Sequence, residues 1–236
     1  TWMTTVTLNR LTRPQSLRMI RQVTGGKAFS AEVMEQLAEK MDGVPLFVEE
    51  LTRMVLETGQ FEETDTSYEL LGEVTQLSIP TTLHDSLMSR LDRLGAVKEL
   101  AQWSAVLGRE FSYEIIEKVT SYDEDVLQEG LGRLVASELV FQHGLGPQAQ
   151  YRFKHALVQD VAYESLQRRM RQACHRRVAQ VLLEDFPEIA EMQPELLAHH
   201  YTGAGEDETA VTYCQQAADR ALQRSATQEA IAHLRQ

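Results

Sequence analysis

Apolar residues recur at helical spacing along most of this chain, and that periodicity is the strongest constraint on its fold. The clearest run is a set of leucines spaced by four, four and three residues: Leu83, Leu87, Leu91 and Leu94. Residues so spaced lie on one face of an α-helix, so the run predicts an amphipathic helix with one buried stripe. Weaker stripes predict helices at 14–23, at 31–41 and from Pro45 onward, where a proline in the first turn loses no hydrogen bond.

Residues 96–154 combine three helical stripes with two short strands. We expect the strands at 139–142 and 150–153, joined by a loop that contains glycine and proline. Three helices followed by a two-stranded wing is the order of a winged-helix domain. The 59 residues of this segment are the right length for one.

The rest of the chain predicts helices throughout. They are expected at 156–166, 168–185, 194–203 and 207–223, and a last helix is expected to open with the capping-box pair Ser225 and Gln228. Small residues next to Tyr213 resemble the second helix of a tetratricopeptide repeat: Ala210, Ala217, Ala218 and Ala221. We therefore expect a mainly α fold with a helical lid, a winged helix with a two-stranded wing, and tetratricopeptide-like helical hairpins.

Charge and cysteine content narrow the class of protein. The 35 acidic and 23 basic residues give a net charge of −12, which opposes binding to DNA, RNA or anionic membranes. The two cysteines, Cys174 and Cys214, form neither a disulfide framework nor a zinc signature, so we expect core residues in a reducing compartment. No apolar run is long enough to span a bilayer, and no signal peptide pattern is visible. The expectation is a cytoplasmic protein that binds neither membrane nor nucleic acid.

Two motifs carry a resemblance to a known family. The first is Gly43-Val44-Pro45-Leu46-Phe47-Val48-Glu49-Glu50-Leu51, and the second is Tyr151-Arg152-Phe153-Lys154-His155-Ala156-Leu157. Together they resemble the STAND class of signalling NTPases, in the version fused to class III adenylate cyclases and related regulators. The resemblance covers essentially all 236 residues. It concerns the part of the switch that senses nucleotide rather than the part that hydrolyses it.

The resemblance implies three nucleotide-contacting residues. Gly43 and Pro45 would open the lid helix, with Pro45 against the adenine, and His155 would contact the β-phosphate of ADP in the closed, inactive form. ATP or ADP would bind only together with an upstream ATPase domain of the same chain. Local chemistry also allows other roles: a turn followed by an N1 proline at Gly43 and Pro45, and a capping or packing histidine at His155. Phe153-Lys154-His155 departs from the family's commoner Phe-His pair by one inserted residue.

The implied organisation runs through six segments. Residues 1–60 would hold the end of an ATPase core, with a short strand at 5–8, and the lid. A linker would follow at 61–80, with a short strand near 68–71. The remaining segments are a connecting helix at 81–95, the winged helix at 96–154, a helical connector at 155–190 and the start of a tetratricopeptide-like repeat at 191–236. The first and last residues read as positions inside a longer protein, and a protein or small-molecule ligand would bind the repeats.

Other motifs predict no catalytic or metal site. Gly25-Gly26-Lys27 lacks the first glycine and the final hydroxyl of a phosphate loop, so we interpret it as a helix C-cap turn. Glu195, His199 and His200 lack zincin spacing, and we expect no metal. The arginines at 168–177 are spread around their helix and flanked by acids, which favours a solvated or salt-bridged face.

Two other functions stay open from the sequence. One is a winged-helix transcriptional regulator, which the acidic third helix argues against, since Asp123, Glu124, Asp125 and Glu129 outnumber Arg133. The other is a protein-interaction scaffold built on the helical repeat. We expect no enzymatic activity from this segment alone under any of these functions.

Overall fold

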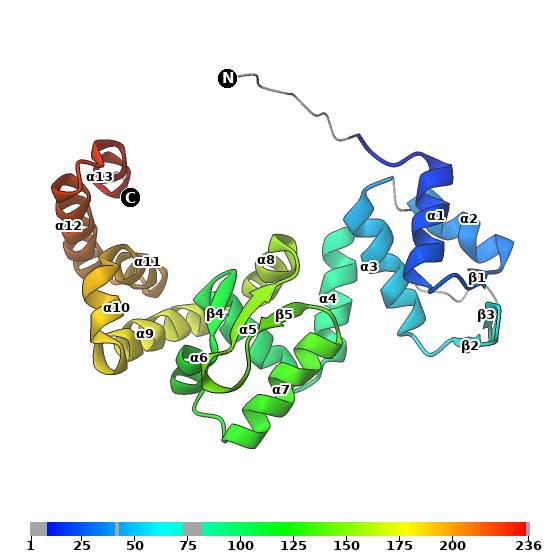
Figure 1. The fold of residues 1–236 in the computed structure, drawn as a ribbon, viewed down its shortest axis with the longest axis horizontal. Helices are drawn as coiled ribbons and strands as arrows, with labels where there is room; N and C mark the ends of the chain where they lie inside the picture. The colour runs from blue at the N-terminus through cyan, green and yellow to red at the C-terminus, as the bar shows by residue number, and fades with distance from the viewer. Residues whose placement is uncertain (1–8, 41–42, 73–81, 235–236) are drawn as a thin grey trace. The chain divides into compact units, whose positions relative to one another are not determined.

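The computed structural model describes residues 9–40, 43–72 and 82–234. These residues form thirteen α-helices and two small three-stranded sheets, so the expected mainly α fold class is confirmed (Figure 1). The chain divides into two compact units, Thr1–Arg93 and Leu94–Gln236, which are described separately below. No helix in the described part of the chain has the length and apolar character needed to cross a membrane. The strand expected at 5–8 lies outside the described residues.

The N-terminal unit contains four helices and one sheet. The helices are α1 (Arg13–Val23), α2 (Ala31–Lys40), α3 (Pro45–Leu56) and α4 (Leu83–Arg93), and the strands are β1 (Ala28–Phe29), β2 (Phe61–Glu63) and β3 (Ser67–Leu70). All four helices begin where the sequence predicts, to within one residue. At α4 the Thr82 hydroxyl accepts the Asp85 N–H at 3.1 Å, as an N-cap does. The core of this unit is formed by buried apolar residues of its helices and of β1: Ile20, Phe29, Val33, Met34, Leu37, Phe47, Val48, Leu51, Met54 and Val55.

The segment expected as a solvated linker contains a β-hairpin instead of one short strand. Strand β2 pairs antiparallel with β3, and β1 adds in parallel on the other side of β3. The aromatic rings explain the pairing: Phe29 lies 5.0 Å from Phe61 and 5.6 Å from Tyr68 between ring centroids. The sequence does not predict both strands, because each is short and contains exposed glutamate next to its aromatic residue.

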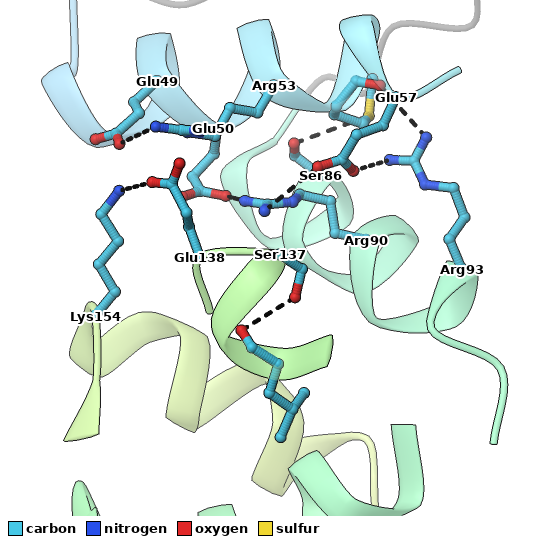
Figure 2. A network of polar contacts seen from close by, with 12 residues as sticks. Glu49, Glu50, Arg53, Glu57, Ser86, Arg90, Arg93, Ser137, Glu138 and Lys154 are labelled. Atoms are coloured by element: carbon cyan, nitrogen blue, oxygen red, sulfur yellow. Dashed lines mark hydrogen bonds and ion pairs between the residues drawn. The ribbon is translucent and has the colours of Figure 1, made fainter. Parts of the chain in front are cut away.

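A buried ion pair joins α3 to α4 (Figure 2). Glu50 and Arg90 leave only 1% and 2% of their side chains exposed, and a guanidinium N–H of Arg90 donates to the Glu50 carboxylate. Glu57, the C-cap residue of α3, also pairs with Arg90 at 3.5 Å and with Arg93 at 3.7 Å. Glu50, the second glutamate of the motif at 43–51, therefore has a structural role in this unit.

The C-terminal unit begins with mixed elements and continues as helices. The first part comprises α5 (Val97–Leu107), β4 (Glu110–Ser112), α6 (Tyr113–Thr120), α7 (Glu124–Ala136), β5 (Val140–His143) and β6 (Gln150–Phe153). The second part comprises α8 (Ala156–Glu164), α9 (Arg168–Asp185), α10 (Pro187–Met192), α11 (Pro194–Ala204), α12 (Asp207–Gln223) and α13 (Thr227–Leu234). Strands β4, β6 and β5 form an antiparallel sheet in that order.

Three features of this unit differ from the sequence-based expectation. Strand β4 and helix α10 were not predicted, because three and six residues are too few to establish a period. The predicted capping box at Ser225 is wrong, since α13 begins at Thr227 and Ser225 adopts a positive φ of 61° in the preceding turn.

Buried residues from α5, α6, α9, α11 and α12 form one core, which includes Val106, Val119, Val178, Leu182, Leu197 and Ala210. Residues 96–154 and the helices that follow are therefore packed together.

Loss of the buried ion pair should destabilise the N-terminal unit strongly. Replacing Arg90→Met leaves the Glu50 carboxylate buried without its main counter-ion, so we expect a loss of about 3–5 kcal/mol of unfolding free energy. Urea unfolding followed by circular dichroism measures this. The matched control is Arg13→Met, which removes a surface ion pair to Glu35 and should cost less than about 1 kcal/mol. Equal effects of the two substitutions would contradict the role assigned to Glu50 and Arg90.

Candidate functional site

The turn before α3 can be built only with glycine at position 43. Gly43 is buried and has a φ of +68°, a conformation that favours glycine. The Leu11 N–H donates to the Gly43 carbonyl at 2.7 Å, and a Cβ added at Gly43 would lie 2.2 Å from the Leu11 carbonyl oxygen. This close backbone contact fixes where the first turn of α3 begins.

Pro45 occupies the first position of α3 and its side chain is exposed. The structure therefore agrees with the turn-plus-N1-proline geometry, and it leaves the proline ring accessible for a contact. A hollow of about 580 Å³ lies beside the turn, with a lining that includes Arg10, Arg13, Glu35 and Gly43. The lining of the hollow mixes polar and apolar residues and includes the side chains of Arg10 and Arg13, with Arg13 paired to Glu35 at 2.8 Å.

His155 is in the C-terminal unit, between β6 and α8. It is the N-cap residue of α8, with extended backbone angles, and its side chain is half-buried. Its carbonyl accepts the Val158 N–H at 3.1 Å, but the imidazole makes no capping hydrogen bond to the helix. Of the two ordinary roles considered for His155, packing fits this geometry and side-chain capping does not.

The other sequence motifs have structural explanations. The C-cap turn predicted at Gly25 and Gly26 is confirmed, since both have positive φ and the Gly26 N–H donates to the Arg21 carbonyl at 2.7 Å. The Lys27 ammonium bonds Glu63 at 2.6 Å and the Thr64 carbonyl at 2.7 Å, which anchors it to the hairpin.

Several arginine side chains of helix α9 make contacts within the C-terminal unit. Arg176 pairs with Glu206, Arg177 donates to the Lys118 carbonyl at 2.9 Å, and Arg171 lies over the Tyr163 ring at 4.4 Å from its centroid. One of these contacts is an ion pair, and Arg168, Arg169 and Arg176 are exposed, which agrees with the solvated or salt-bridged face expected from the sequence.

Three histidines that the sequence analysis did not connect come together between α9 and α11. His175 on α9 meets His199 and His200 on α11, and one ring nitrogen of each lies within 4.8 Å of those of the others. His175 and His200 are each 1% exposed, whereas His199 is exposed to solvent. The ring nitrogens Nδ1 of His175 and His200 are 2.9 Å apart, and Nε2 of His175 is 2.9 Å from the Tyr163 hydroxyl. No spacing in the sequence could reveal this group, because His175 comes from a different helix.

Burial keeps these imidazoles neutral. Desolvation, followed by the charges of His199 and Arg171, lowers the pKa of His175 to about 4. Desolvation, followed by the neighbouring histidines, lowers the pKa of His200 to about 3, and desolvation also lowers the pKa of His199. At neutral pH the buried rings are therefore in the form whose nitrogen lone pairs can bind a metal. The adjacent Cys174 is a free, buried thiol whose pKa is raised to about 11, chiefly by desolvation, so it stays protonated.

The close backbone contact at Gly43 predicts a large effect from a single added methyl group. Gly43→Ala should destabilise the N-terminal unit by more than about 2 kcal/mol, because the left-handed conformation costs about 1–2 kcal/mol and the Cβ would also overlap the Leu11 carbonyl. The matched control is Gly59→Ala, since Gly59 has nearly the same φ of +69° but nothing within 4 Å of an added Cβ. Chemical unfolding of both variants isolates the overlap. A Gly43→Ala variant as stable as Gly59→Ala would show that the Leu11 contact is dispensable.

Comparison with known proteins adds one relative. No family model matches the chain. An uncharacterised protein of Rhizobium meliloti (strain 1021) is 29% identical to it over 189 residues. The match covers 80% of this chain and 18% of that protein, so this chain corresponds to less than a fifth of the relative's length.

Proposed function

We propose that this chain is the nucleotide-sensing, regulatory region of a STAND-type ATPase within a multidomain signal-transduction protein associated with an adenylate cyclase. The observation that carries the proposal is the Gly43–Pro45 turn, with its glycine held against the Leu11 backbone and its proline ring exposed at the start of α3. In this proposal the exposed Pro45 ring packs against the adenine of a nucleotide held by an ATPase domain. The lining of the hollow beside the turn includes Arg10, Arg13 and Glu35, the ion-pair partner of Arg13, and the excess of arginine over glutamate there supports a face turned toward an anionic ligand.

The element order of the C-terminal unit supports the same proposal. Helix α5, strand β4, helices α6 and α7, and the β5–β6 hairpin follow one another as in a winged-helix domain, and β4 pairs with β6 to complete a three-stranded sheet. His155 follows the wing directly, at the start of α8. There its imidazole would donate to the β-phosphate of ADP in the closed state.

The helices at the end of the chain support a repeat-type sensor. Helices α11 and α12 pack against each other, and α12 buries small residues against its neighbours: Ala210, Ala217, Ala218 and Ala221. The stacked rings of Tyr201 and Tyr213, 5.4 Å between centroids, join the same pair of helices. This arrangement supports a tetratricopeptide-like hairpin, whose ligand would be a protein or small molecule. The match covers only 18% of the relative from Rhizobium meliloti, which agrees with the proposal that this chain is a segment of a long multidomain protein.

The mechanism proposed is a two-state switch. ADP would hold the lid and the winged helix against the ATPase domain through Pro45 and His155, and exchange for ATP or ligand capture by the repeats would release them. The chain itself has no phosphate loop in its sequence, so the hydrolytic chemistry would belong to the ATPase domain.

A DNA-binding role predicts a different surface. Helix α7, at the position of a reading helix, exposes the carboxylates of Glu124, Asp125 and Glu129, and its N-cap residue Asp123 is exposed as well. Arg133 is exposed, and its guanidinium donates to the Leu94 carbonyl at 3.0 Å. These carboxylates would repel phosphates, and we therefore place DNA binding second.

The chain should show no useful affinity for duplex DNA. We expect no binding of a random duplex at micromolar protein in low salt, because both α7 and the net charge of −12 oppose phosphate approach. Fluorescence anisotropy with a salt titration measures this. Micromolar binding that weakens steeply with salt would favour the transcriptional regulator over the nucleotide switch.

The second test uses the longer protein that contains the ATPase domain. Replacing His155→Ala should lower ADP affinity about tenfold, since a hydrogen bond to a charged group contributes about 1.5–3 kcal/mol. Cyclase output without stimulus should rise in the same variant. Equilibrium dialysis with labelled ADP measures the affinity. The control is His143→Ala, an exposed histidine on β5.

The outcome of this test separates the sensor role from packing. If His155 only packs, its replacement lowers the melting temperature of the chain and leaves ADP affinity unchanged. That result would contradict the phosphate contact.

A further inference from the structure

The three histidines between α9 and α11 have the composition of a transition-metal site. Neutral imidazole is a preferred ligand of Zn²⁺, Cu²⁺ and Ni²⁺, whereas Ca²⁺ and Mg²⁺ require oxygen ligands. His175, His199 and His200 offer three ring nitrogens within 4.8 Å of one another and no carboxylate. A tetrahedral zinc ion with Zn–N bonds of about 2.0–2.1 Å needs its ligand nitrogens roughly 3.3 Å apart. The buried pair, at 2.9 Å, is already near that separation.

The environment of His175 resembles that of a metal ligand with an outer partner. Two Nδ1 atoms at 2.9 Å require a proton between them, and a metal ion would replace that proton. His175 would then carry its proton on Nε2, which lies 2.9 Å from the Tyr163 hydroxyl oxygen and could donate to it. Ligating histidines commonly donate their second ring N–H in this way, which fixes the orientation of the ring.

The backbone around the cluster is shaped to the His175 ring. A Cβ added at Gly203 on α11 would lie 2.6 Å from three atoms of that ring, so only glycine leaves room for it. The ring is therefore held against one face of α11, beside His199 and His200. Since His199 is exposed, the third ligand can rotate toward the ion, and one coordination position would face solvent.

We propose that His175, His199 and His200 bind one Zn²⁺ or a similar divalent transition-metal ion, which links α9 to α11. The expectation of no metal rested on the spacing of Glu195, His199 and His200, and His175 lies on a different helix. The positive charge of Arg171 acts on His175 and opposes a cation, but the guanidinium lies over Tyr163 and donates to the Leu166 carbonyl at 3.2 Å. With three neutral ligands and this repulsion, we expect micromolar affinity rather than the tighter binding of cysteine-rich zinc sites.

The test is a zinc titration of the full chain, purified with a tag that contains no histidine and stripped with a chelator. Isothermal titration calorimetry should give one equivalent of Zn²⁺ per chain at micromolar affinity, and Co²⁺ should give the visible bands of a tetrahedral ion. His199→Ala should weaken binding at least tenfold without unfolding the chain, because this side chain is exposed. His143→Ala, on β5 of the same unit, should bind as the unchanged chain does.

Two further readouts keep the proposal independent of any single variant. Zn²⁺ should raise the melting temperature of the unchanged chain by a few degrees and that of His199→Ala by much less, since only the native state holds the site. Tyr163→Phe should weaken zinc binding about tenfold while leaving the stoichiometry at one, as expected for a residue that orients a ligand.

Two results would overturn the proposal. One is no calorimetric binding of zinc in the micromolar range by the unchanged chain. The other is equal binding by the unchanged chain and His199→Ala, which would place the ion elsewhere on the surface.

Discussion

The buried ion pair between Glu50 and Arg90 determines how α3 meets α4, and the geometry of the N-terminal unit depends on it. Two charges that are 1% and 2% exposed are tolerated only when they face each other, so the two helices have little freedom to slide. The apolar neighbours on α3, among them Val48, Leu51 and Val55, are packed into the same core. The ion pair thus selects one packing among the several that apolar side chains alone would allow.

Helix α3 is held at two points, and this explains why its first turn is exposed in a defined place. The Leu11 backbone binds Gly43 just before the helix, and Arg90 binds Glu50 in the next turns. Between these contacts, Pro45 has no backbone N–H that needs a partner, and its ring remains at the surface. A rigid frame around an accessible ring is what the proposed adenine contact needs, because a ligand gains most from a group that is ordered before it binds.

The C-terminal unit buries neutral polar side chains, whereas the N-terminal unit buries an ion pair. Its buried histidines are kept neutral by desolvation. His175 places one ring nitrogen against His200 and the other against the Tyr163 hydroxyl. These rings join α9 and α11, whose apolar residues also pack with α5 and α6. A change at the histidines would therefore act on a core shared by the proposed winged helix and the proposed repeat.

The sequence by itself determined the local structure of this chain. Periodic apolar residues identified the long helices, the N1 position of Pro45 followed from proline chemistry, and the acidic character of α7 followed from counting charges. The short strands β1, β2 and β4 were not predicted, because each has only two or three residues. The pairing of β1 and β4 also depends on strands distant in the chain. The resemblance pointed to Gly43, Pro45 and His155, but sequence alone could not show that Gly43 touches the Leu11 backbone.

Only the tertiary structure decided which polar residues meet. Glu50 and Arg90 are 40 positions apart, and His175 and His200 are 25 apart, so no helical or strand period relates them. Such pairs form when apolar stripes dock two helices together, and the docking chooses their polar partners as a consequence. Local patterns specify which face of a helix is buried, whereas the identity of the facing residue is set by the packing of the whole unit.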